Sequence, residues 1–310
     1  MVNPYWGANF FQFFSTLGHR LFSVLRGEKL VLAPDEVQIL VLAAVAVSCG
    51  LIGSFLVVRK MTMVANSLSH TLLLGIVFSS LLFSGQLNMA ALLVSAFLTA
   101  LITVGLSYLL AKSPFVKEDA GVGLSFTTLF ALGLIALMLF SKSTHIGVEV
   151  VMGNLDAVHA DDIFFSWSIA IIDALLLMLF YPWLKVHSFD STFSFSLRLP
   201  CKSLDLLFLL LVSLTCVGAF RSVGVLIVLV FLTGPALCGK IFCHRLGRIL
   251  LVSVGIGLLV TLLSVAMARH ILSVYHTPLS TAGIASVLIG LAVLFALATT
   301  ARRMLPSISK

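Results

Sequence analysis

The chain alternates long apolar segments with short polar ones. The apolar runs lie near residues 37–58, 62–84, 88–111, 119–141, 161–184, 203–219, 223–243, 249–270 and 280–300. A helix of about 20 apolar residues is long enough to cross the hydrocarbon core of a bilayer. The runs therefore predict an all-α fold, a polytopic bundle of about nine transmembrane helices. Only Phe220, Arg221 and Ser222 separate the sixth and seventh runs, so short or broken helices there would allow eight to ten spans.

A different pattern occupies residues 1–36. Apolar side chains recur there at helical spacing, with polar side chains largely opposite them. The apolar set is Phe10, Phe13, Phe14, Leu17, Leu21, Val24 and Leu25. An amphipathic helix of this kind lies in the membrane interface. No Lys or Arg precedes Arg20, which is unlike a cleavable signal peptide. We therefore expect an interfacial arm over 1–36 and a transmembrane domain over 37–305.

The positive charges predict the orientation of the bundle. If the first span runs inwards, most of the 19 Lys and Arg residues fall in cytoplasmic loops. Outside the arm, only Lys142, Arg221 and Arg269 then lie on the outer side. Cytoplasmic loops of membrane proteins are enriched in Lys and Arg. The sequence thus predicts an outside N-terminus and an inside C-terminus, an arrangement that needs an odd number of spans and favours nine.

Composition and motifs exclude several classes of protein. The chain is 60% hydrophobic and 10% charged, whereas soluble domains carry about 25% charged residues. Its net charge of +7 comes from basic residues scattered through short loops, so no nucleic acid partner is expected. The sequence contains no GxxxxGK[ST], GxSxG or HExxH motif and no paired carboxylates. We therefore predict no enzyme activity and no resident cofactor, with any energy source supplied by another chain or an ion gradient.

Polar residues within the predicted spans are the candidates for function, because charged groups are costly inside a bilayer. Asn66 and His70 are four residues apart in the second span and share one helix face. An imidazole and a carbonyl oxygen on one face can ligand a divalent metal ion, although a polar seam between helices gives the same pattern. Asp173, near the middle of the fifth span, is predicted as a metal ligand, a proton carrier or the partner of an internal donor.

The longest predicted cytoplasmic loop contains a second candidate, the segment 187–202. Ser188 or Asp190 can cap a short helix there, and Phe189, Phe193 and Leu197 follow one another at intervals of four residues. An apolar ridge in the cytoplasm indicates either a partner with a matching groove or a helix lying flat on the membrane.

Five segments, in order along the chain, resemble the motifs of a known family. They are Ala65-Asn66-Ser67-Leu68-Ser69-His70-Thr71, Lys117-Glu118-Asp119-Ala120-Gly121-Val122-Gly123, Met152-Gly153-Asn154-Leu155, Phe189-Asp190, and Ser222-Val223-Gly224-Val225-Leu226 followed by Gly234-Pro235-Ala236. The family is that of the permeases of manganese, zinc and iron ABC importers. The resemblance covers nearly the whole chain from about residue 37.

The resemblance implies roles for both candidates. The family places a metal-contacting Asp and His at the positions of Asn66 and His70, so an amide stands here in place of a carboxylate. Its cytoplasmic Phe-Asp motif, matched by Phe189 and Asp190, contacts the ATPase. The family's later Ala and Gly in that motif are Ser194 and Arg198 here.

The function that the resemblance implies is that of a multi-pass permease subunit in the bacterial inner membrane, importing Mn, Zn or Fe. The implied partners are an ABC ATPase, an extracytoplasmic metal-binding protein and a second permease subunit. Asn66, where the family carries Asp, favours a partner permease that is not identical. Imidazole and oxygen ligands suit all three metals.

Two other transport functions stay open at this point. A permease for metal chelates or cobalamin-like cofactors would need a wide apolar path. A secondary transporter driven by an ion gradient would use Asp173 for protons, but such folds often contain internal repeats and none is seen here.

Overall fold

The computed structural model describes residues 4–7, 9–26, 32–63, 66–67, 71, 74–75, 77–79, 89–111, 118–140 and 155–308. Helices make up the regular structure of this part of the chain, which confirms the predicted all-α fold. They are α1 (Phe10–Leu25), α2 (Pro34–Val58), α4 (Met89–Ala111), α5 (Glu118–Phe140), η1 (Leu155–Ala157), α7 (Ala160–Phe189), α8 (Ser191–Ser196), α9 (Cys201–Val223), α10 (Val225–Phe242), α11 (Leu246–Tyr275) and α12 (Thr281–Ile308).

Six helices of the described part are long and apolar enough to cross a membrane. These are Pro34–Val58, Ala120–Leu139, Ala160–Phe189, Cys201–Phe220, Leu246–Tyr275 and Thr281–Thr300. Shorter apolar helices lie at Phe97–Ser107 and Ile227–Phe242. The polytopic helical bundle is therefore confirmed, while the count of nine spans and the sidedness of the termini stay predictions.

The sixth and seventh apolar runs are separate helices, and the break between them is sharper than the sequence indicated. Helix α9 continues through 220–222 and ends at Val223, and α10 begins at Val225. Gly224 between them has φ +93°, a conformation that residues with a Cβ rarely adopt. Its N–H donates to the carbonyl of Phe220. A single glycine thus turns the chain from one helix into the next.

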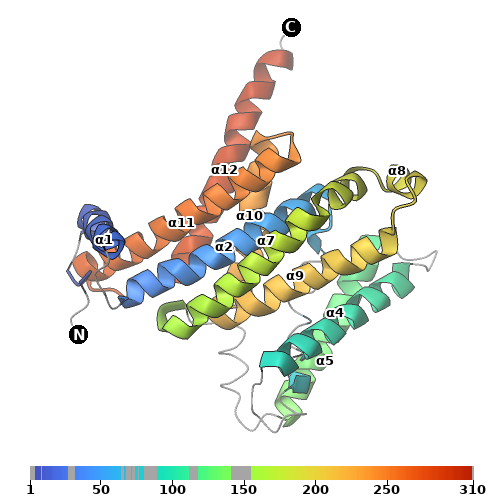
Figure 1. The fold of residues 1–310 in the computed structure, drawn as a ribbon, viewed down its shortest axis with the longest axis horizontal. Coiled ribbons are helices and arrows are strands. Elements are labelled where there is room, and N and C mark those ends of the chain that lie inside the picture. The colour runs from blue at the N-terminus through green and yellow to red at the C-terminus, as the bar shows by residue number, and fades with distance from the viewer. Residues whose placement is uncertain are drawn as a thin grey trace.

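Helix α2 is the centre of the bundle, with α7, α9, α10 and α11 packed around it (Figure 1). Within the chain, 83% of its span is buried, against 17% for the span in α5. Small residues allow this close packing. A methyl group on Gly53 would lie 1.8 Å from the carbonyl oxygen of Leu232 in α10, so the two backbones are in direct contact there.

This contact predicts the effect of a single methyl group. Gly53→Ala is expected to destabilise the purified chain by about 1–3 kcal/mol, because overpacking forces the α2 and α10 backbones apart. Thermal unfolding in detergent measures the loss. Gly105→Ala is the matched control, since a methyl group there has no heavy atom within 4 Å. Equal unfolding temperatures for the two variants would contradict the prediction.

The N-terminal arm forms helix α1, which crosses the end of α11 (Figure 1). Tyr5 and Phe13 are fully buried against Val265 and Ala266 of α11. Part of the predicted apolar face thus packs on protein, whereas Phe11 on the outer side is 85% exposed. The placement of this arm in the membrane interface stays a prediction.

A hydrogen bond and an ion pair connect this arm to the start of α2. Tyr5 donates a hydrogen bond of 2.8 Å to Glu36 Oε1, and Arg20 pairs with the same carboxylate. The neighbouring Asp35, 2% exposed, pairs with Arg269 of α11. Buried charges of this kind are stable only when paired, so these contacts fix the first turn of α2 against both α1 and α11.

Candidate functional site

The second predicted span, 62–84, carries the Asn66–His70 pair and is described in part. Residues 62–63, 66–67, 71, 74–75 and 77–79 are helical. Asn66 belongs to this helix and is half-buried. His70 lies outside the described residues. The pairing of Asn66 and His70 as metal ligands therefore stays a prediction.

The same helix packs on α4 through small and polar groups. The hydroxyls of Thr71 and Thr103 lie 3.0 Å apart, and a methyl group on Gly75 would lie 2.9 Å from Thr99 Oγ1. Thr71 and Gly75 are four residues apart and share a face. A polar seam thus exists between this segment and α4 at Thr71.

Asp173 is fully buried in α7 and bridges helices. Its Oδ2 accepts a hydrogen bond of 2.8 Å from Thr215 Oγ1 in α9, and Ser48 of α2 also bonds to its carboxyl group. The buried thiols of Cys49 and Cys216 lie nearby. In the described residues there is no group of three or more His, Cys, Asp or Glu side chains placed to hold a metal ion.

This geometry matches the third sequence interpretation of Asp173, that of a partner for internal donors. Its hydroxyl partners join three helices of the core. A role as a metal ligand or a proton carrier stays a prediction that no contact of the described residues tests.

A substitution separates these interpretations. Asp173→Asn keeps an oxygen that can accept from Thr215 but removes the ionisable group, so we expect metal uptake to stay within about twofold of wild type. Asp173→Leu, which leaves the Thr215 hydroxyl without this acceptor, should lower stability by about 1–3 kcal/mol. Uptake rates normalised to the amount of chain in the membrane, together with thermal unfolding, provide the measurement. Loss of uptake in Asp173→Asn would indicate that the charge itself is used.

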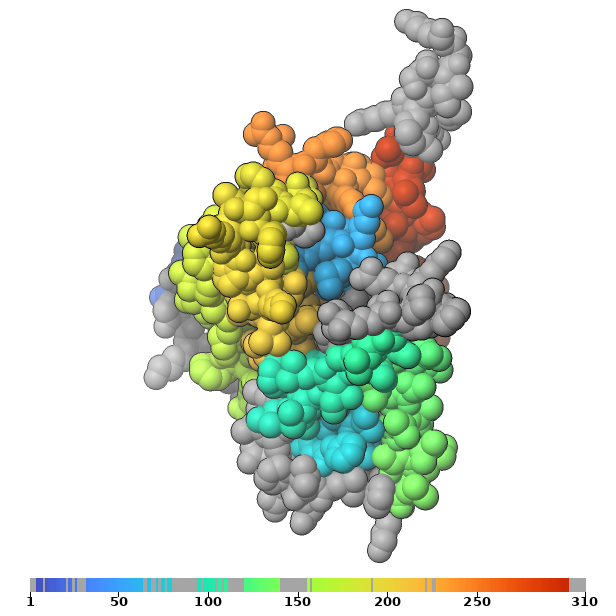
Figure 2. All heavy atoms as spheres, turned by 90° about the vertical axis from the view of Figure 1, so that its right-hand side faces the viewer, coloured from blue at the N-terminus to red at the C-terminus, as the bar shows by residue number. Residues whose placement is uncertain are grey.

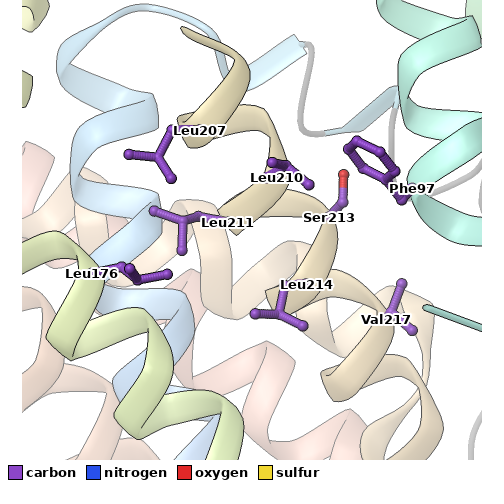
Figure 3. Close-up of a pocket in the computed structure, with 8 residues that line it drawn as sticks. All are labelled: Phe97, Leu176, Leu207, Leu210, Leu211, Ser213, Leu214 and Val217. Carbon is purple, nitrogen blue, oxygen red and sulfur yellow. The ribbon is translucent and has the colours of Figure 1, made fainter. Parts of the chain in front are cut away.

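A cavity of about 300 Å³ lies between α4, α7 and α9 (Figure 3). Among the described residues its lining is almost entirely apolar: Phe97, Leu176, Leu207, Leu210, Leu211, Ser213, Leu214 and Val217. The Ser213 hydroxyl donates to the carbonyl of Leu209 at 2.8 Å and is therefore occupied. A metal ion needs imidazole, thiolate or oxygen ligands, so this cavity does not suit one. Its volume is also at the low end for organic ligands, which does not favour a path for bulky chelates.

The second candidate, the segment 187–202, forms a capped short helix as predicted, with Asp190 rather than Ser188 as the cap. Asp190 Oδ1 accepts from the backbone N–H groups of Thr192 and Phe193 at 2.9 and 3.0 Å. The Thr192 hydroxyl and these amides hold the pKa of the Asp190 carboxyl below its ordinary value. A six-residue helix too short to be stable alone thus receives a fixed N-terminus.

Helix α8 presents an apolar outer surface. Phe189, Phe193 and Leu197 are 59%, 53% and 51% exposed. Phe195, which the spacing of four residues did not include, is more exposed still. We call these four residues the apolar ridge. Figure 2 shows α8 and the start of α9, in yellow, at the surface beside the end of α2, in blue.

The inner side of α8 faces a polar cluster that sequence reasoning missed. Arg59, at the end of α2, donates to Asp205 of α9 at 3.0 Å and to Ser188 of α7 at 2.9 Å. His187 Nε2 lies 2.8 Å from the same Asp205 oxygen. The only signal in the sequence was that ionisable residues occur at the same predicted end of three spans.

Three comparisons with known proteins agree with this architecture. The model of the ABC 3 transport family matches residues 36–301. A "Probable metal transport system membrane protein" of Chlamydia trachomatis is 38% identical, covering 95% of this chain and 92% of its own length. The manganese transport system membrane protein MntD of Bacillus subtilis is 35% identical over 69% of this chain and 76% of its own. PsaBC from Streptococcus pneumoniae, solved with Fab, shares the fold with TM-score 0.72 and 20% identity, over 84% of this chain and 89% of that one.

Proposed function

The chain belongs to the ABC 3 transport family, and we propose that it is the permease subunit of a bacterial ABC importer for divalent transition-metal ions. The observation that carries this proposal is the family match, which extends from the first turn of α2 into α12 and so includes all the predicted spans. Relatives that match most of this length are named as metal and manganese transport membrane proteins.

The energy for transport is proposed to come from a separate ATPase subunit. The sequence contains no P-loop motif of its own. The apolar ridge of α8 supplies the contact surface, because four large apolar side chains at a predicted cytoplasmic end are unfavourable in water and call for a partner groove. The chain itself then performs no covalent chemistry.

The transported ion is proposed to be coordinated transiently by His70, with help from Asn66. An imidazole and an amide oxygen make a site that suits Mn, Zn and Fe alike. A neutral amide binds a dication less strongly than a carboxylate does. Weak coordination is compatible with transport, since the ion has to be released as well as captured.

The second permease subunit is proposed to be a different chain. A homodimer would carry Asn66 twice and would have no carboxylate at this position, whereas a partner with Asp would supply one. The test is to reconstitute this chain with its ATPase alone and then with a relative that carries Asp. Full transport without the relative would rule out the heterodimer. Transport that appears only when the relative is added would support it, and Asn66→Asp should then partly replace the relative.

The function itself is tested by metal accumulation in proteoliposomes. They contain this chain, its ATPase and the second permease subunit, with the extracytoplasmic binding protein on the outside. We expect accumulation of manganese, zinc or iron that requires ATP and persists when a protonophore removes the proton gradient. Accumulation that depends on the gradient and not on ATP would instead support a secondary transporter, and uptake of chelates alone would support the chelate permease.

A further inference from the structure

Arg59 is the centre of the polar cluster beneath α8. Its side chain is 5% exposed, and its guanidinium lies 4.5 Å from the ring centre of Phe208 in α9. Burial lowers the pKa of this guanidinium, and the Asp205 carboxylate opposes that change. The Asp205 side chain is 49% exposed, whereas the guanidinium is buried and depends on its polar partners. The ion pair therefore connects the end of α2 to the start of α9.

Helix α8 is attached to the same carboxylate through His187. The imidazole uses both of its nitrogens, with Nε2 2.8 Å from Asp205 Oδ1 and Nδ1 3.2 Å from Ser194 Oγ. Ser194 of α8 is fully buried, and its neighbours Phe193 and Phe195 each lie about 100° away around the helix. The imidazole is itself only 8% exposed. A displacement of α8 is thus transmitted to Asp205 through directed hydrogen bonds.

The cluster also adjoins the span that carries Asn66. Helix α2 ends in a tight turn in which Lys60 has φ +60° and the Met61 N–H donates to the carbonyl of Leu56 at 2.9 Å. This turn is closed by two backbone bonds, since the Lys60 N–H also donates to Val57. Residues 62–63, which follow directly, and 66–67, which include Asn66, are helical. Movement of Arg59 therefore has only a short stretch of chain between it and Asn66.

We propose that Arg59, His187 and Asp205 form the linkage that couples movement of α8 to the span carrying Asn66. This inference rests on the proposed function, in which the ATPase acts on α8. These are positioning residues, and neither the metal ion nor the ATPase needs to touch them. When these residues are replaced, ATP hydrolysis should continue with less metal transported, while the ATPase and the metal ion still bind.

The test is the number of metal ions transported per ATP hydrolysed, measured in proteoliposomes that contain the complete importer. Asp205→Ala is expected to lower this ratio about fivefold while ATP hydrolysis continues. Asp205→Glu, which keeps the carboxylate, should restore most of the ratio. Lys185→Ala is the matched control, because Lys185 is exposed in α7 outside the segment 187–202 and its side chain has no hydrogen bond or ion pair among the described residues.

Ser194→Ala provides a milder variant that removes a single hydroxyl. It should lower the ratio about twofold without affecting membrane insertion. An unchanged ratio in Asp205→Ala, or in Ser194→Ala if the first variant does not insert, would overturn the linkage while leaving the proposed function intact. If the unaltered complex transports no metal, the proposed function fails and this inference fails with it.

Discussion

Phe193→Asp is expected to abolish co-purification of the ATPase with this chain. Phe193 is in the middle of the apolar ridge and is 53% exposed, so its replacement leaves the packing of the bundle almost unaffected. In the complex the new carboxylate would be desolvated against an apolar groove without a partner. Aromatic anchors at interface centres contribute about 2 kcal/mol or more, which corresponds to roughly 30-fold in affinity.

The matched variant is Phe193→Leu, which keeps an apolar side chain at the same position and should retain most of the binding. Both variants are extracted from membranes in equal amounts and the bound ATPase is quantified. A full complement of ATPase on Phe193→Asp would show that docking takes place elsewhere. In that event the apolar ridge would be better explained by the membrane surface, the other interpretation of its sequence pattern.

His70→Ala is expected to reduce metal uptake at least about tenfold. Substituting a residue that only supports a metal ligand already lowers metal affinity or activity by about 10–100-fold, and His70 is proposed as a ligand itself. The imidazole is the stronger of the two proposed ligands, because the Asn66 amide carries no charge. Uptake is measured as an initial rate, divided by the amount of chain in the membrane. ATPase binding should not change, because α8 is not altered.

His244→Ala is the control for this experiment. His244 is exposed in the turn between α10 and α11, and its loss should leave the uptake rate unchanged. Equal rates for His70→Ala and wild type would remove His70 from the path. Asn66→Asp tests the same site in the opposite direction, since a carboxylate should bind the ion more tightly.

The sequence predicted the helices well and their ends less well. The fifth apolar run stops near residue 184, yet α7 continues to Phe189. The length of an apolar run reflects the thickness of the bilayer core. The helical backbone hydrogen bonds do not depend on that apolar character, so the helix continues through polar residues such as Lys185 and His187. For the same reason α12 extends beyond the last apolar run, which ends near residue 300.

Contacts between distant segments could not be read from spacing. Arg59 and Asp205 are 146 positions apart, and each looks like an ordinary residue at the end of a span. Asp173 was identified because a carboxylate inside a span is costly, but its partner Thr215 was not, since hydroxyls are common in membrane helices. Residue type indicates that a buried polar group needs a partner, and only the fold identifies that partner.

The arm shows a further limit of pattern analysis. The pattern predicts that the apolar face of α1 contacts lipid, which stays a prediction, and it did not indicate that Phe13 of that face packs against α11. A lipid tail and a neighbouring helix select the same apolar side chains. Arg20 and Tyr5 of the arm bond to the Glu36 carboxylate, which belongs to α2. The amphipathic pattern of α1 alone therefore could not predict that the arm packs on the bundle.

Helix α2 is held by polar contacts at both of its ends. Its first turn is bonded to the arm and to α11, and Arg59, which directly follows its last residue, is bonded to α7 and α9. Between them are 25 residues, roughly 37 Å of uninterrupted helix, whose one proline stands at the very start. A continuous helix without an internal proline is less prone to a sharp kink along its length. If the proposed ATPase acts near Arg59, a tilt imposed there is therefore expected to reappear at the other end of α2, which contacts the N-terminal arm.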